Sequence, residues 1–163
     1  MTIDAFNALP EADARERLTG CLDVSRWVDT VLAGRPYADP AALRAVASAA
    51  ADLTDTELEA ALARHPRIGE RAGSGHDAAH SAREQAGVDP ADRDVAARIA
   101  AGNVAYEERF DRVFLIRASG RTGPQILAEL ERRLGNDEAA EREETVRQLR
   151  EIALLRLDQL VGE

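Results

Sequence analysis

The sequence contains a single cysteine, Cys21, among its 163 residues. One cysteine cannot form an internal disulfide, which is typical of proteins from a reducing compartment. Aromatic residues are also scarce, with one Trp, two Tyr and three Phe. No stretch approaches the roughly 20 apolar residues that a membrane-spanning helix requires. We therefore expect neither a disulfide-stabilised scaffold nor a membrane protein.

An excess of positive charge is missing as well. The chain carries 21 basic and 30 acidic residues, for a formal net charge of −9. This balance argues against nucleic acid and anionic membranes as partners. The first 18 residues, MTIDAFNALPEADARERL, contain neither the basic region nor the long apolar stretch of a signal peptide. We therefore expect no signal peptide and a cytoplasmic protein.

The residues that are abundant favour helices. Ala, Leu, Arg and Glu are strong helix formers, and they dominate the composition. The length suits one domain. We predict an all-α, single compact domain over residues 1–163, with about seven to eight helices.

Several helix ends can be predicted from capping residues. Asp39 followed by Pro40 starts one helix, and Thr54 with Glu57 forms a capping box for the next. Ser25 is predicted to cap a helix that Gly34 ends. A long helix is expected to run from Asp89-Pro90 to about Phe110, and another from Thr122 to Gly135, after which Asn136 caps the last helix.

Two stretches interrupt the helical pattern. Residues 65–75, HPRIGERAGSG, contain a proline and three glycines and predict a loop. Its first residue, His65, is a candidate for proton transfer, because an unperturbed imidazole titrates at about pH 6.5. The structural alternative is an exposed or capping histidine. Residues 113–118, VFLIRA, predict a short buried extended segment between two helices.

A second candidate site lies on the predicted helix of residues 76–87. His76, His80 and Glu84 recur every four residues and therefore share one helical face. This spacing suits a metal site, although a solvated polar face is the simpler interpretation. Ser81, Glu84 and Gln85 alternatively form a polar patch for a small hydrogen-bonding ligand.

The extended segment is a third candidate. Its backbone can bind a planar heterocycle, and Arg117 or Arg121 can pair with a carboxylate. We expect structural roles elsewhere. Trp27, Tyr106 and Phe110 are predicted in the core and Asn103 on the surface. The Arg132-Arg133 pair and residues 141–144 are predicted to be solvated helix faces.

An ordered set of motifs covers nearly the whole chain. It comprises FNALP near the start, SRW at 25–27, RP at 35–36, HPRIGE at 65–70, SAREQAG at 81–87, NVAYEERF at 103–110, FLIRASGRT at 114–122, LGN at 134–136 and LRLDQL at 155–160. The set resembles the 2-oxo-4-hydroxy-4-carboxy-5-ureidoimidazoline (OHCU) decarboxylases, which form S-allantoin in urate breakdown.

The resemblance implies a specific site. It implies that His65 is the catalytic proton donor and Glu84 its acidic partner, and that no metal or organic cofactor takes part. It further implies an anionic heterocyclic substrate and a homodimer. The implied substrate-binding residues are Pro66, Ser81, Ala82, Arg83, Gln85, Phe114, Leu115, Ile116, Arg117 and Ala118. Arg121 remains a further candidate from the sequence itself. Which arginine meets the substrate carboxylate stays open.

Two other functions remain as alternatives. One is a metal-dependent hydrolase that uses His76, His80 and Glu84. The other is a non-catalytic helical module that binds a ligand. His76 and His80 lie outside the family pattern, which favours the cofactor-free decarboxylase.

Overall fold

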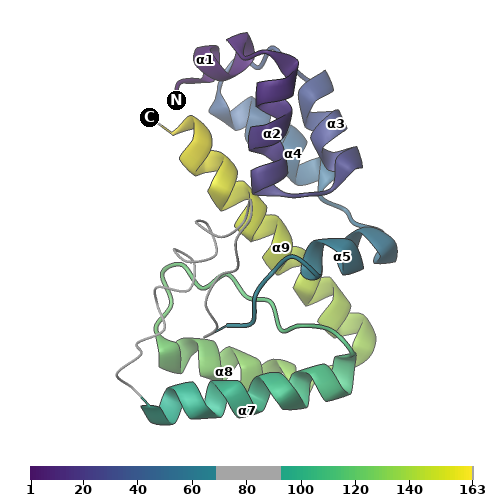
Figure 1. The fold of residues 1–163 in the computed structure, drawn as a ribbon, viewed down its shortest axis with the longest axis vertical. Coiled ribbons are helices and arrows are strands. Elements are labelled where there is room, and N and C mark those ends of the chain that lie inside the picture. The colour runs from purple at the N-terminus through teal and green to yellow at the C-terminus, as the bar shows by residue number, and fades with distance from the viewer. Residues whose placement is uncertain (69–92, 163) are drawn as a thin grey trace. The chain divides into compact units, whose positions relative to one another are not determined.

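The computed structural model describes residues 1–68 and 93–162, and within these ranges it contains eight helices and no strand (Figure 1). The predicted all-α class is therefore confirmed. The helices are α1 (Ile3–Ala8), α2 (Glu11–Cys21), α3 (Ser25–Ala33), α4 (Pro40–Ala50), α5 (Asp55–Leu62), α7 (Arg93–Phe110), α8 (Gly123–Arg133) and α9 (Glu138–Val161). None of the described helices is long and apolar enough to cross a membrane.

The chain forms two compact units. One consists of Met1–Ala61 with Arg150–Glu163, and the other of Leu62–Leu149. In the first unit Trp27 is fully buried on α3, and its indole Nε1 donates to the carbonyl of Ala47 on α4 at 2.8 Å. Arg156 of α9 is also buried there and donates to the carbonyl of Cys21 at 3.3 Å. This unit holds none of the predicted site residues.

Most of the predicted helix ends are confirmed. The Asp39 carboxylate accepts from the amide of Ala42 at 2.7 Å, and Thr54 and Glu57 bond to each other's main-chain amides. Gly34 caps the end of α3 as predicted. Ser25, however, is the first residue inside α3 rather than its cap.

The predicted cap of the last helix is wrong by one residue. Asp137, not Asn136, accepts from a first-turn amide, that of Ala140, at 2.8 Å. The Asn136 side chain instead donates forward to the carboxylates of Glu141 and Glu144, at 3.0 and 3.1 Å. Asp also complements the positive end of the helix dipole, which favours it as the cap.

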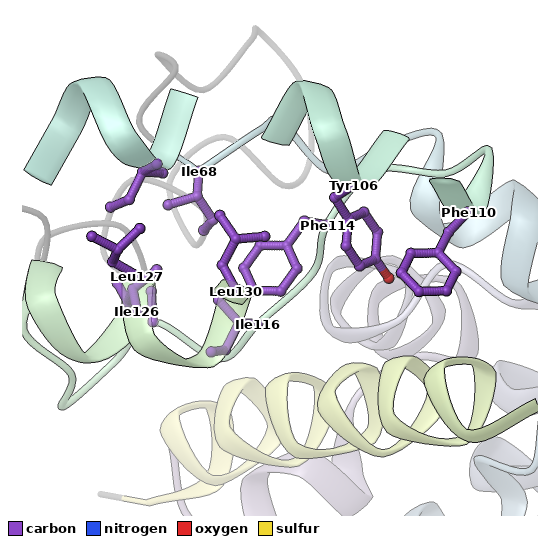
Figure 2. Packing of buried hydrophobic residues seen from close by; sticks show 10 residues of the cluster. Ile68, Tyr106, Phe110, Phe114, Ile116, Ile126, Leu127 and Leu130 are labelled. Atoms are coloured by element: carbon purple, nitrogen blue, oxygen red, sulfur yellow. The ribbon is translucent and has the colours of Figure 1, made fainter. Parts of the chain in front are cut away.

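The second unit is built around α7 and α8, which run side by side (Figure 1). Their close approach depends on Gly102, because a Cβ atom there would lie 2.5 Å from the Leu130 side chain. Tyr106 and Phe110 of α7 are buried as predicted, with ring centroids 4.8 Å apart. Figure 2 shows the core cluster that these helices share with Ile68, Phe114 and Ile116.

Candidate functional site

The predicted catalytic histidine lies just beyond the end of α5. The main-chain amide of His65 donates to the carbonyl of Leu62 at 3.0 Å. His65 and Pro66 are half-buried, whereas Ile68 is only 7% exposed and belongs to the core cluster. The segment of residues 65–68 is therefore fixed at both ends, by a main-chain bond at the helix end and by a buried core residue.

Helix α7 holds this segment at two points. Arg67 binds the carboxylate of Glu107 with both Nε and Nη2, at 2.5 and 2.8 Å. Hydrogen bonds from Arg67 lower the pKa of Glu107. One turn earlier, the Asn103 amide donates to the carbonyl of Ile68 at 3.2 Å. We predicted an exposed Asn103, but it is 5% exposed. That prediction is wrong because Asn103 lies four residues after Ile99 and three before Tyr106, on the core face of α7.

The segment of residues 114–118 forms neither a helix nor a strand. Phe114, Leu115, Ile116 and Ala118 are each at most 5% exposed, and Arg117 is half-buried. The segment ends in a turn where Gly120 has a φ of 78°, a conformation that glycine adopts without strain. The prediction of a buried connection between two helices is confirmed.

Side chains from α8 and α9 fix the backbone of the 114–118 segment. Arg133 donates to the carbonyl of Leu115 at 2.7 Å, and the Gln148 amide oxygen accepts from the amide of Arg117 at 2.9 Å. Arg121 Nε donates to the Arg117 carbonyl at 3.1 Å. Among the described residues, the main-chain N–H and C=O groups of Phe114 and Ile116 and the N–H groups of Leu115 and Ala118 form no hydrogen bond. The fixed segment therefore presents several main-chain groups for a ligand.

A fully buried ion pair supports this arrangement. Arg133 and Glu141 are both 0% exposed, and Nε and Nη2 of Arg133 lie 2.9 and 2.5 Å from Glu141 Oε1. The Tyr106 hydroxyl donates to the same oxygen at 2.5 Å. Burial and this carboxylate raise the pKa of Tyr106 to about 12, so the phenol stays protonated. The Arg133 guanidinium also lies 4.6 Å from the Phe114 ring centroid.

The solvated-face prediction is therefore wrong for Arg133 and Glu141. The helical period contains the signal that was missed. Arg133 follows Leu130 by three residues and Ile126 by seven, and Glu141 shares its face with Thr145 and Gln148. A charged residue on an apolar face indicates a buried, paired charge.

Glu144 gives this region a pH-dependent stability. Hydrogen bonds from Arg132, at 2.8 and 2.7 Å, lower the pKa of Glu144 from 4.5 to about 2. Because the folded pKa lies below the unfolded one, this contribution is complete above pH 4.5 and is lost as the pH falls toward 2. We expect the urea midpoint to fall more steeply between pH 5 and 2 in the wild type than in Glu144→Gln. Equal slopes would contradict this assignment.

The structure brings two of the three predicted segments together. Ile68 and the three residues Phe114, Ile116 and Ala118 belong to one core cluster, with Ile68 near the Phe114 ring in Figure 2. The third segment lies outside the described residues. So do all the residues predicted on it: His76, His80, Ser81, Ala82, Arg83, Glu84 and Gln85. Among residues 1–68 and 93–162, no three His, Cys, Asp or Glu side chains are grouped as a metal site requires. The metal alternative, which rests on the third segment, stays untested.

Comparisons with known proteins agree on one family. A family model described as OHCU decarboxylase matches residues 7–158. A 2-oxo-4-hydroxy-4-carboxy-5-ureidoimidazoline decarboxylase from Amia calva is 31% identical over 135 residues, which cover 80% of this chain and 77% of the relative.

Solved structures share the fold. A crystal structure of an OHCU decarboxylase in the presence of (S)-allantoin superposes with a TM-score of 0.73 at 21% identity, covering 91% of this chain and 99% of that one. A crystal structure of an (S)-allantoin synthase gives 0.71 at 18% identity, covering 96% of this chain and 53% of that one. The present chain thus spans about half the length of the synthase.

Proposed function

The chain belongs to the OHCU decarboxylase family, and from this premise we propose that it converts OHCU to S-allantoin in urate breakdown. One observation supports the proposal most strongly. The half-buried His65 and the fixed 114–118 backbone belong to segments that meet at one core cluster, within a chain that matches the family model over residues 7–158.

The chemistry requires a leaving carbon dioxide and one proton. The bond between ring carbon C4 and its carboxylate breaks, and its electron pair passes into the adjacent unsaturated C5–N bond of the ring, so the proposal requires neither a metal nor an organic cofactor. The C4 hydroxyl gives up its proton as C4 becomes the carbonyl of allantoin. A proton added to one face of C5, the carbon that carries the ureido group, sets the S configuration. Placed hydrogen-bond donors stabilise the developing charge, and a site closed to water protects it from stray protons.

We assign the proton delivery to His65. Pro66 restricts the backbone beside the imidazole and contacts the substrate. Glu84 orients the substrate hydroxyl or the imidazole. Ser81 and Gln85 hydrogen-bond the polar edges of the ureido group and ring, within a binding segment that also includes Ala82 and Arg83.

The 114–118 segment clamps the ring in this proposal. The Leu115 carbonyl and the Arg117 amide are bonded to Arg133 and Gln148, whereas the peptide groups of Ile116 are not bonded within the described residues. The Phe114 N–H and C=O and the amides of Leu115 and Ala118 are likewise not bonded within this part of the chain. We therefore assign the ring contacts to these main-chain groups of the 114–118 segment. Arg117 or Arg121 pairs with the carboxylate.

A coupled assay tests the function. Freshly generated urate oxidation product is mixed with the purified protein, and its disappearance is followed against a buffer control. We expect acceleration over the spontaneous decay. A protein that binds (S)-allantoin without accelerating the decay would instead support the non-catalytic binding module.

Chelation separates the decarboxylase from the metal-dependent hydrolase. Because the proposed proton transfer uses a side chain, we expect full activity after exhaustive treatment with a chelator. Loss of activity that zinc restores would overturn this expectation and favour a site at His76, His80 and Glu84. The His76→Ala variant is a matched control, since it should retain activity only under the cofactor-free mechanism.

We propose that residues 1–163 act as one domain, in a cytoplasmic homodimer. The match of a single family model to residues 7–158 spans both compact units and supports one domain. The single cysteine, which is typical of proteins from a reducing compartment, supports the cytoplasm. The homodimer rests on the family resemblance alone, and sedimentation at micromolar concentration would test it.

A further inference from the structure

Asn103 occupies a position where asparagine is costly. It lies in the middle of α7 and is 5% exposed. Asparagine is a poor residue for a helix interior, because its amide competes for backbone hydrogen bonds. A buried amide also needs partners for both of its ends. An apolar residue of the same size would pack at this position without either cost.

Only one end of the Asn103 amide is bonded. Nδ2 donates to the Ile68 carbonyl at 3.2 Å. This contact fixes the amide orientation, because a carbonyl only accepts and must face the NH2 group. Oδ1 is left buried, and within the described residues it has no hydrogen-bond partner. The unsatisfied group is therefore an acceptor that would bind an N–H or O–H donor.

The location of Asn103 connects it to the proposed site. The Ile68 carbonyl that it binds lies three residues after His65 in the chain. Glu107, one turn further along the same face of α7, binds Arg67. This face of α7 thus contacts two consecutive residues of the 65–68 segment, and the unpaired acceptor lies at that contact.

We infer that Oδ1 of Asn103 accepts a hydrogen bond from an N–H group of the bound ureide, while Nδ2 holds the 65–68 segment in place. This inference rests on the proposed function, because OHCU and allantoin carry ureido and ring N–H donors. A buried acceptor rejects an analogue that lacks the matching donor, because the acceptor is then left unpaired in the complex. Asn103 would therefore make the site prefer ligands with an N–H group at one position over analogues that lack it.

Calorimetric binding tests the inference. (S)-allantoin is compared with a set of analogues, each of which has a different N–H replaced by CH2 or N–CH3. We expect the wild type to bind one analogue about tenfold or more weakly than allantoin. In Asn103→Leu that preference should disappear. Glu107→Gln is the matched control, since it loosens the 65–68 segment without removing Oδ1, and it should keep the preference.

A second measurement needs no variant. The chain has three asparagines, at positions 7, 103 and 136, so selective ¹³C labelling resolves each side-chain carbonyl. Saturation with (S)-allantoin should shift the Asn103 signal, while those of Asn7 and Asn136 serve as internal references. An unmoved Asn103 signal, or an unchanged preference in Asn103→Leu, overturns the inference. If either of these results is found in an enzyme that is active, only the inference about Asn103 fails and the proposed function stands. If the wild type neither binds allantoin nor consumes the substrate, both the inference and the proposed function fail.

Discussion

Replacing His65 by Asn is expected to abolish the formation of optically active allantoin while leaving the fold intact. A positioned general acid contributes typically 10²–10⁴-fold to rate, so a loss of this size is expected in a coupled assay. His65 is half-buried beyond the end of α5, and its main-chain bond to Leu62 does not depend on the side chain. Circular dichroism and thermal melting should therefore match the wild type.

The neighbouring Arg64 provides a control for this experiment. Arg64→Gln changes an exposed residue beside His65 and should keep both the rate and the handedness of the product. Near-normal activity in His65→Asn, with an unchanged circular dichroism spectrum, would show that another group delivers the proton.

The second large effect concerns stability. Arg133→Met removes one member of a fully buried ion pair and leaves Glu141 with an uncompensated charge. Breaking such a pair costs about 3–5 kcal/mol, which we expect as a loss in the free energy of unfolding measured with urea. The same substitution frees the carbonyl of Leu115 from its 2.7 Å bond. Substrate binding should weaken in any fraction that remains folded.

Two further variants make this prediction specific. Arg98→Met breaks a pair in which Arg98 and Glu131 are 54% and 52% exposed, and it should cost no more than about 1 kcal/mol, as exposed ion pairs do. The double variant Arg133→Met with Glu141→Leu replaces both charges by apolar groups and should recover much of the loss. A single Arg133→Met variant as stable as the wild type would contradict the assigned role of the pair.

Local sequence patterns predicted much of this fold. Caps such as Asp39 and the Thr54–Glu57 box depend on contacts three residues apart, which a sequence displays directly. The buried connection at residues 114–118 also followed from local composition, because a short apolar run lacked turn residues. These features agree with the structure because neighbouring residues decide them.

Features that depend on distant partners were not predicted. Arg133 and Glu141 can be buried because they pair with each other and because the Tyr106 hydroxyl and the Leu115 carbonyl bond to them. These partners lie on separate elements. Asn103 is buried because its partner is the carbonyl of Ile68, 35 residues away. The helical period shows that these polar residues lie on apolar faces. It does not show which residues from other elements bond to them. For the site, the meeting of residues 65–68 with 114–118 likewise needed the tertiary structure.

The handedness of the product tests the central claim most directly. Fresh urate oxidation product is incubated with the wild-type protein, and the circular dichroism of the resulting allantoin is recorded against a protein-free control. We predict (S)-allantoin formed faster than the spontaneous decay, and racemic allantoin at the spontaneous rate with His65→Asn. Racemic allantoin at the spontaneous rate from the wild type would contradict the account.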